Sequence, residues 1–136
     1  MERYSAIWIL FATDQDRSKR FYEKVLGMQP SLDAPGMTEF RLSAHAKLGI
    51  MPGDGITRIL NGRIRNPNDG ERATRCELYL YVDDPDEYYQ RAVKAGGKGI
   101  SRGEIRNWGD YVAYCSDDDG HLIAFARPVR SAMGPA

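Results

Sequence analysis

The same pattern occurs twice in this chain, as AIWILFATDQDRSKRFYEKVLG at residues 6–27 and as CELYLYVDDPDEYYQRAVKAGG at residues 76–97. Each copy begins with an apolar, β-prone run that leads to an Asp. A segment with apolar residues at helical spacing follows, and each copy ends on glycine. Asp14 corresponds to Asp84 and Gly27 to Gly97 at the same offset, so the copies superpose without a gap. The sequence therefore predicts a duplicated strand–helix unit.

Length and composition narrow the class of protein. The chain has 136 residues, which is enough for one compact domain with a real core. Its 19 Lys and Arg balance 19 Asp and Glu, so no net charge draws it to nucleic acid or to an anionic membrane. There is no secretory signal pattern and no apolar run near the roughly 20 residues of a membrane span. We therefore expect a cytoplasmic protein with neither nucleic acid nor membrane as a partner.

Cysteine usage agrees with a reducing compartment. Only Cys76 and Cys115 occur, and they form no CxxC motif. Thiols in such a compartment are rarely paired and usually pack as small hydrophobic groups. Both are expected to be buried.

The segments after each predicted helix complete the architecture. In the first copy, residues 38–42 and 47–51 are predicted strands, and in the second copy residues 111–115 and 122–126 flank the turn DDDG. The sequence predicts an α+β fold of two βαβββ modules in tandem, with mixed sheets curved round a shared cleft. The expected boundaries are module 1 at about 3–52, a connector at 53–74, module 2 at about 75–128 and a tail at 129–136.

Two groups of residues resemble a known family. The chain is similar to the glyoxalase I, bleomycin-resistance protein and extradiol dioxygenase group, the vicinal oxygen chelate superfamily, over nearly its whole length. The first group is Asp14, Arg17, Ser18, Phe21, Tyr22, Leu26 and Gly27; the second is Trp108-Gly109-Asp110 with DDDGHLI at 117–123. Members of this family include lyases, epimerases, dioxygenases and metal-free drug binders, so the resemblance implies the fold but not one activity.

The resemblance also implies where a metal would bind. The family's metalloenzymes hold one divalent ion through four strand positions, which fall here on Ile7, Gly49, Glu77 and Ala124. Only Glu77 can coordinate a metal, whereas a catalytic ion usually needs about three protein ligands. His45 lies in a predicted turn, and His121 is out of strand phase with Ala124. We therefore expect no metal cofactor.

Strand alternation predicts what faces the cleft instead. If Glu77 faces the cleft, Tyr79 and Tyr81 share its side of the strand. Tyr111 and Tyr114 have opposite phase, so one of them should also face in. An ion pair between Glu77 and Arg41 in a closed interior is the alternative to a binding cleft. The predicted ligand-binding residues are Phe11, Glu39, Arg41, Met51, Glu77, Tyr79, Tyr81 and Trp108.

Three functions are compatible with this lining. The first is metal-free binding of a small aromatic or anionic ligand in the cleft between the modules. The second is an enzyme of the same family, a lyase, isomerase or dioxygenase, which either uses Glu77 as a general base or holds a metal through unrecognised ligands. The third is a structural or protein-interaction module with a collapsed cleft. A homodimer is expected, because two similar modules expose sheet edges.

Overall fold

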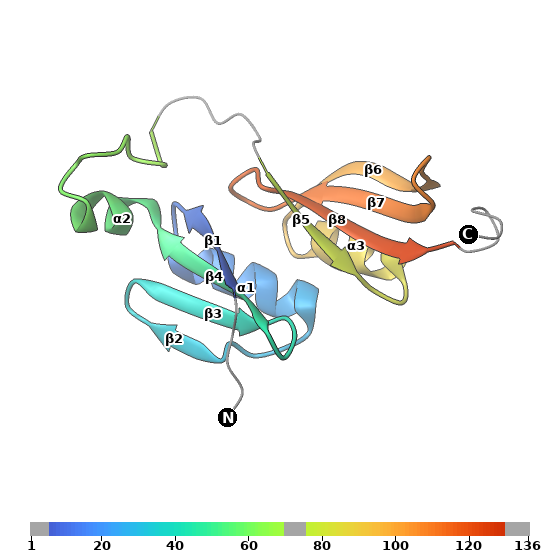
Figure 1. Ribbon diagram of the computed structural model, residues 1–136, viewed down its shortest axis with the longest axis horizontal. Helices are drawn as coiled ribbons and strands as arrows, with labels where there is room; N and C mark the ends of the chain where they lie inside the picture. The colour runs from blue at the N-terminus through green and yellow to red at the C-terminus, as the bar shows by residue number, and fades with distance from the viewer. Residues whose placement is uncertain (1–5, 70–75, 130–136) are drawn as a thin grey trace. The chain divides into compact units, whose positions relative to one another are not determined.

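The structure is a computed structural model that describes residues 6–69 and 76–129. It divides into two compact units, called here module 1 (Met1–Arg72) and module 2 (Ala73–Ala136). Figure 1 shows one four-stranded sheet in each unit. Each module is described by itself.

Module 1 has a mixed sheet with the strand order β1-β4-β3-β2. Strand β1 runs parallel to β4, and the other neighbours are antiparallel. A short helix, α2, occupies part of the segment expected to connect the modules. The elements are β1 (Ala6–Ala12), α1 (Gln15–Leu26), β2 (Leu32–Ala34), β3 (Met37–Arg41), β4 (Ala46–Pro52) and α2 (Gly53–Ile59).

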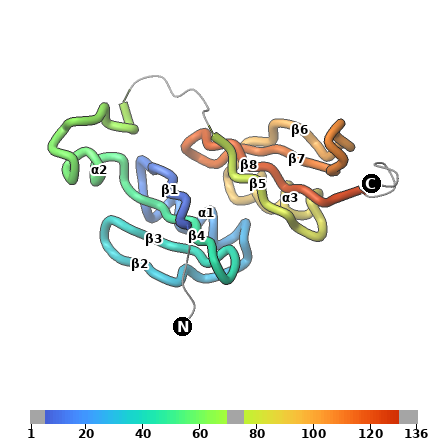
Figure 2. The backbone as a smooth tube through the Cα atoms, viewed as in Figure 1, coloured from blue at the N-terminus to red at the C-terminus, as the bar shows by residue number. Residues whose placement is uncertain are grey.

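Module 2 repeats this topology with the strand order β5-β8-β7-β6. Strand β5 runs parallel to β8, as β1 does to β4. The backbone traces of the modules show the same sequence of strand, helix and three strands (Figure 2). The predicted α+β fold of two tandem βαβββ modules is thereby confirmed. The elements are β5 (Glu77–Tyr81), α3 (Pro85–Lys94), β6 (Lys98–Ile105), β7 (Asp110–Ser116) and β8 (Leu122–Pro128).

The repeated Asp residues cap the two long helices. Asp14 Oδ1 accepts a hydrogen bond from Arg17 N at 3.1 Å, and Asp84 Oδ1 accepts one from Glu87 N at 3.2 Å. Each carboxylate satisfies a backbone donor that lacks a partner in the first helical turn. The glycines that end the two helices are offset by one residue relative to the gapless alignment of the two sequence copies. Gly27 is left-handed in module 1, but in module 2 the left-handed glycine is Gly96 rather than Gly97.

One face of each sheet packs against its long helix. Helix α1 contacts β3 and β4, and α3 contacts β6, β7 and β8. These contacts bury the apolar side chains that hold each module together. In module 1 the buried set includes Leu10, Phe21, Tyr22, Val25, Phe40, Leu48 and Ile50; in module 2 it includes Ala92, Ala113, Cys115, Ile123 and Phe125. We call the opposite side of each sheet its reverse face.

Two burial predictions were wrong. Alternation along residues 6–12 predicts that Trp8 shares the helix-covered side with Leu10, yet 58% of the Trp8 surface is exposed. It lies near the start of an edge strand, so only β4 flanks it within the sheet. Cys115 is buried as expected, but Cys76 is exposed just before β5 begins.

Strand β6 is the edge strand of module 2, and its pairing with β7 is irregular. The register shifts between Gly99 and Ser101 and again between Ser101 and Glu104. A side chain at Gly99 would collide with the Tyr89 hydroxyl, and one at Gly103 would collide with the Tyr111 ring. These glycines therefore let two tyrosines lie across the strand. No helix in the described part of the chain is long and apolar enough to cross a membrane.

Candidate functional site

The reverse face of module 2 carries two tyrosines over a floor of small side chains. The strand register aligns Tyr79, Ala124 and Tyr114 in one row across β5, β8 and β7. Val112, Ala124 and Ala126 form the floor, each 0% exposed, and Tyr79 and Tyr114 pack against it. Since the floor residues are small, the tyrosine rings can lie close to the sheet.

A chain of hydrogen bonds holds Tyr79 and Trp108. The Tyr79 hydroxyl donates to Asp110 Oδ2 at 2.6 Å, and Trp108 Nε1 donates to the Tyr79 oxygen at 2.9 Å. Asp110 is only 8% exposed. Burial, together with the hydrogen bond to Asp110, raises the pKa of Tyr79 to about 12, so the phenol stays protonated near neutral pH. The orientation of the Trp108 indole is therefore set through Tyr79 by a buried carboxylate.

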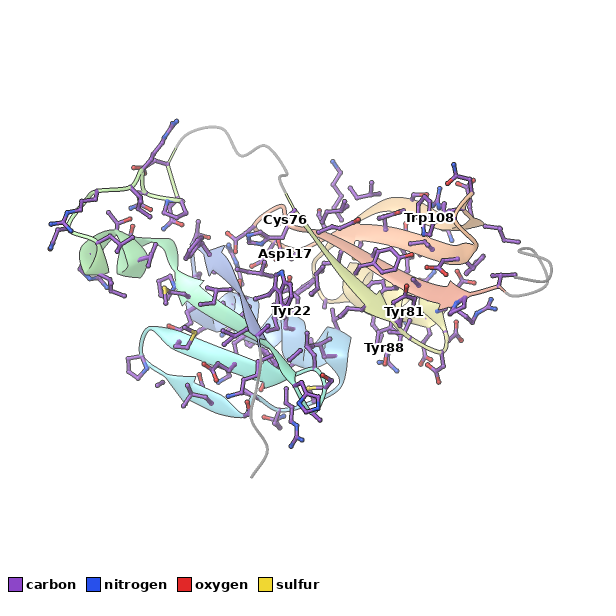
Figure 3. The ribbon with its side chains drawn as sticks, viewed as in Figure 1. Tyr22, Cys76, Tyr81, Tyr88, Trp108 and Asp117 are labelled. Carbon is purple, nitrogen blue, oxygen red and sulfur yellow. The ribbon has the colours of Figure 1, made fainter. Side chains whose placement is uncertain are left out.

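A third ring extends this arrangement. Tyr81 lies edge-on to Tyr79, with ring centroids 5.4 Å apart and an interplanar angle of 69°. Tyr81 is 67% exposed and Trp108 is 50% exposed. Figure 3 shows Tyr81 on β5 and Trp108 in the turn that precedes β7. We call Tyr79, Tyr81 and Trp108 the aromatic cluster.

Tyr114 on β7 and Arg106, directly after β6, lie beside this cluster. The Arg106 guanidinium is 5.1 Å from the centroid of the Tyr114 ring, and it donates to Ser101 Oγ and to the Val112 carbonyl. Burial raises the pKa of Tyr114, and the charge of Glu77 raises it further against the opposing effect of Arg106. Glu77 itself is exposed on β5.

Of the two tyrosines of opposite phase, Tyr114 lies on the reverse face and Tyr111 does not. Tyr114 is in the row with Ala124 on the reverse face. The Tyr111 hydroxyl instead donates to Asp86, which is in the first turn of α3.

The predicted site residues of module 1 lie on its reverse face. Phe11 is aligned with Met51 in the sheet, and Glu39 is aligned with Gly49. Glu39 forms an ion pair with Lys47 at 2.9 Å. Arg41 Nε donates to the Ser43 carbonyl at 3.4 Å. The predicted residues thus form two groups, one in each module, and the cleft expected between the modules stays a prediction.

The residues at the family's metal positions do not fit a divalent ion. A Cβ atom at Gly49 would lie 3.2 Å from Ile9 Cγ1 and 3.3 Å from Ile7 Cδ1, so a ligand side chain there would have to displace its neighbours. Ala124 is covered and lies between two tyrosines. Within residues 6–69 and 76–129, no three His, Cys, Asp or Glu side chains are arranged to hold a metal.

The sequence did not identify Asp110, Arg106 or Lys47 as site residues, and it left Tyr114 as one of two alternatives. Asp110 lies just outside the strand predicted at residues 111–115, although it is the first residue of β7. Its phase with Val112 was the available signal, since residues two apart on a strand share a face. For Arg106 there was no comparable signal, because the register shifts in β6 break the alternation just before it.

A hollow of about 410 Å³ lies in module 1 beside the start of α1. Its polar lining makes internal hydrogen bonds. The Gln15 amide donates to the Ala34 carbonyl and to Thr38 Oγ1, and its oxygen accepts from Gly36 N. These bonds fasten the β2–β3 hairpin to the helix, so we assign this hollow a structural role.

Comparisons with known proteins agree on one family. The model of the Glyoxalase/Bleomycin resistance protein/Dioxygenase superfamily matches residues 6–125. An uncharacterised protein of Mycobacterium bovis is 30% identical over 81 residues, which are 60% of this chain and 53% of that protein. The matched region thus spans about half the length of the relatives found by sequence.

Solved structures share the fold. A glyoxalase-related enzyme from Fulvimarina pelagi is 21% identical, with a TM-score of 0.76, and the match covers 90% of this chain and 86% of that one. A glyoxalase/bleomycin resistance protein/dioxygenase family enzyme from Burkholderia phytofirmans is 16% identical, with a TM-score of 0.77 and coverage of 90% and 97%. At these identities the likeness extends to the fold alone.

Proposed function

This chain belongs to the Glyoxalase/Bleomycin resistance protein/Dioxygenase superfamily, and we propose that it binds a small planar molecule at the aromatic cluster of module 2 without a metal ion. The observation that carries the proposal is the state of Trp108. Its indole N–H is held by Tyr79, yet half of its surface is exposed. An exposed ring held in one orientation is suited to stacking against a planar ligand.

Preorganisation supports a binding role for this face. Binding usually costs conformational entropy, because mobile side chains must be ordered. Here the buried Asp110 carboxylate already orders Tyr79, and Tyr79 orders Trp108. The Tyr79 ring packs against the Val112, Ala124 and Ala126 floor, which supports it from below. A few polar groups set among aromatic rings are typical of small-molecule sites.

The alternative of an enzyme receives less support. General-base catalysis by Glu77 was expected to rely on desolvation in an apolar cleft, but the Glu77 side chain is exposed. Metal-dependent chemistry would need ligands other than the aliphatic and small residues at the family's metal positions. Elemental mass spectrometry of the desalted protein, after incubation with Ni, Zn, Mn or Fe(II), tests this part. Near-stoichiometric bound metal would contradict the metal-free proposal.

A pair of tryptophan variants tests binding at the cluster. We expect 2-naphthalenemethanol, a neutral planar probe, to bind the wild-type chain, as measured by NMR titration. Trp108→Ala should weaken that binding about tenfold, because an aromatic stack contributes about 0.5–1.5 kcal/mol beyond the area it buries.

Trp8→Ala is the matched control, since Trp8 is a comparably exposed tryptophan in module 1. Its affinity for the probe should equal that of the wild type. Equal weakening by both variants, or no binding to the wild type, would contradict the proposal.

A further inference from the structure

We propose that the ligand of the aromatic cluster is a planar cation that carries a protonated nitrogen. This inference rests on the proposed function and narrows the class of ligand. It is carried by two features of the reverse face of module 2: the direction of its hydrogen bonds and the placement of its charges.

The hydrogen-bond donors of Tyr79 and Trp108 are already used. Tyr79 has one hydroxyl hydrogen, which it donates to Asp110. Trp108 has one indole N–H, which it donates to Tyr79. The remaining hydrogen-bonding capacity of these three side chains consists of acceptors: the Asp110 carboxylate and a lone pair on the Tyr79 oxygen. A ligand that forms hydrogen bonds with Tyr79, Trp108 or Asp110 must therefore supply the donor.

The charges on this face also favour a cationic ligand. Asp110 is a buried carboxylate beside Tyr79, whereas Glu77 is aligned with Leu122 at the opposite end of the sheet. No Lys, Arg or His of the described segments lies within ion-pair distance of either carboxylate. The exposed faces of Tyr81 and Trp108 add the negative quadrupole of their rings, which attracts cations. A cation over this cluster would complement the Asp110 carboxylate and the two rings.

The nearby Arg106 does not reverse this preference. Its guanidinium donates to Ser101 Oγ at 2.8 Å and to the Val112 carbonyl at 3.0 Å, and it lies 3.7 Å from a Glu104 carboxylate oxygen. Its Nε has no hydrogen-bond partner in the described part of the chain, but this atom is buried and so out of reach of a ligand. The exposed nitrogens of Arg106 are engaged by β6 and β7, so an anionic ligand would meet the Asp110 carboxylate without gaining a new partner. An anionic ligand is therefore disfavoured, whereas an aromatic one is not.

Three probes of equal ring size test the inference. They are 2-naphthylmethylammonium, 2-naphthalenemethanol and 2-naphthoate, which differ mainly in charge. We expect the ammonium to bind about fivefold more tightly than the alcohol, the gain of a cation–π contact at an exposed site. The naphthoate should bind more weakly than the alcohol. Dissociation constants from NMR titration at one ionic strength provide the measurement.

A charge-removing variant tests the assignment to Asp110. Asp110→Asn removes the charge but keeps a carbonyl oxygen that can accept from Tyr79. The preference for the ammonium over the alcohol should fall to about twofold or less. Glu87→Gln is the matched control: it removes the same charge from α3, where Glu87 pairs with Arg91. That variant should keep the full preference.

The outcomes separate the two proposals. If none of the probes binds, or if binding does not depend on Trp108, the proposed function is wrong. If binding depends on Trp108 but the alcohol or naphthoate binds as tightly as the ammonium, the inference of a cation is wrong and the proposed function stands. Because this wild-type comparison needs no variant of Asp110, it decides the question even if Asp110→Asn does not fold. Raising the salt concentration should weaken only the ammonium, and equal weakening of ammonium and alcohol would also contradict the inference.

Discussion

The reverse faces of the two modules have the same strand order and register but opposite chemistry. Ile9, Gly49 and Glu39 form the middle row of module 1. The corresponding row of module 2 is Tyr79, Ala124 and Tyr114. Module 1 thus has aliphatic side chains and the Glu39–Lys47 ion pair where module 2 has an aromatic cluster around a buried carboxylate. The duplicated scaffold holds its shape through its helix-covered faces, which leaves the reverse faces able to diverge.

The turns between the last two strands of each module show the same divergence. Leu42 N donates to the Ala46 carbonyl at 2.9 Å, and Asp117 N donates to the His121 carbonyl at 3.0 Å. The backbone is therefore closed in the same way in both turns. The module 2 turn also has a side-chain pair, between His121 Nδ1 and Asp117 Oδ2 at 2.7 Å.

The largest expected change in stability comes from the helix-covered face, which is built alike in both modules. Phe40 packs against Tyr22 in module 1, and Phe125 packs against Tyr88 in module 2. Both phenylalanines are 0% exposed. Phe40→Ala and Phe125→Ala should each lower the free energy of unfolding by about 3–5 kcal/mol, because each leaves a cavity in a helix-covered core. Urea denaturation measures the loss.

Tyr81→Ala provides the contrast from a reverse face. Because Tyr81 is largely exposed, its removal should change the free energy of unfolding by no more than about 0.5 kcal/mol. A large loss for Tyr81→Ala, or a small one for either phenylalanine, would contradict the division between a structural face and a variable face.

The two helix N-caps test whether corresponding residues contribute equally to stability in the two modules. Asp14→Ala and Asp84→Ala each remove one side-chain acceptor from the first turn of a helix. Each should lower the free energy of unfolding by about 1 kcal/mol, the usual contribution of an N-cap. Thermal or urea denaturation of both variants tests this. A loss confined to one module would show that the repeated caps are not equivalent.

The smallest effect depends on pH and belongs to module 2 alone. Burial of His121 lowers its pKa, but the hydrogen bond to Asp117 and the charges of Asp117, Asp119 and Asp118 raise it more, so the net shift is upward from 6.5. A raised folded-state pKa stabilises the fold below the unfolded value of 6.5, and this contribution is lost as the pH rises through the folded-state pKa.

The free energy of unfolding should therefore fall by about 1 kcal/mol from about pH 6 to about pH 8, as a charged hydrogen bond becomes a neutral one. Urea denaturation at both pH values measures this. His121→Gln should remove that part of the pH dependence. His45→Gln, in the corresponding turn of module 1, serves as the control and should retain it. A pH dependence that persists in His121→Gln would assign it to another group.

The sequence predicted the parts of this fold that depend on local patterns. Asp14 and Asp84 could be identified as helix starts because a cap lies next to the residues it serves. The phase of Glu77, Tyr79 and Tyr81 followed from alternation within one strand. Strands β2 and β6 were not located, although the module pattern required them. Strand β2 has only three residues, and β6 contains glycines and register shifts that interrupt alternation.

The site was harder to predict because its contacts span long distances in sequence. The hydrogen bond between Tyr79 and Asp110 joins residues 31 positions apart, and no periodicity connects them. Glu39 was expected to be a polar ligand contact, but its partner Lys47 depends on how β3 and β4 align. Alternation assigned Tyr111 and Tyr114 to opposite faces, yet only the β7–β8 register shows which of them lies beside Ala124.

The irregular edge of module 2 has a consequence for how copies of this chain can meet. A straight edge strand offers a regular row of backbone donors and acceptors to another strand, whereas a bulged one does not. Strand β6 shifts register twice, while β5, the other edge of the same sheet, pairs with β8 in unbroken register. The glycines that make room for Tyr89 and Tyr111 therefore lie on an edge that resists strand addition. Any edge-to-edge pairing of two copies through module 2 would therefore use β5 rather than β6.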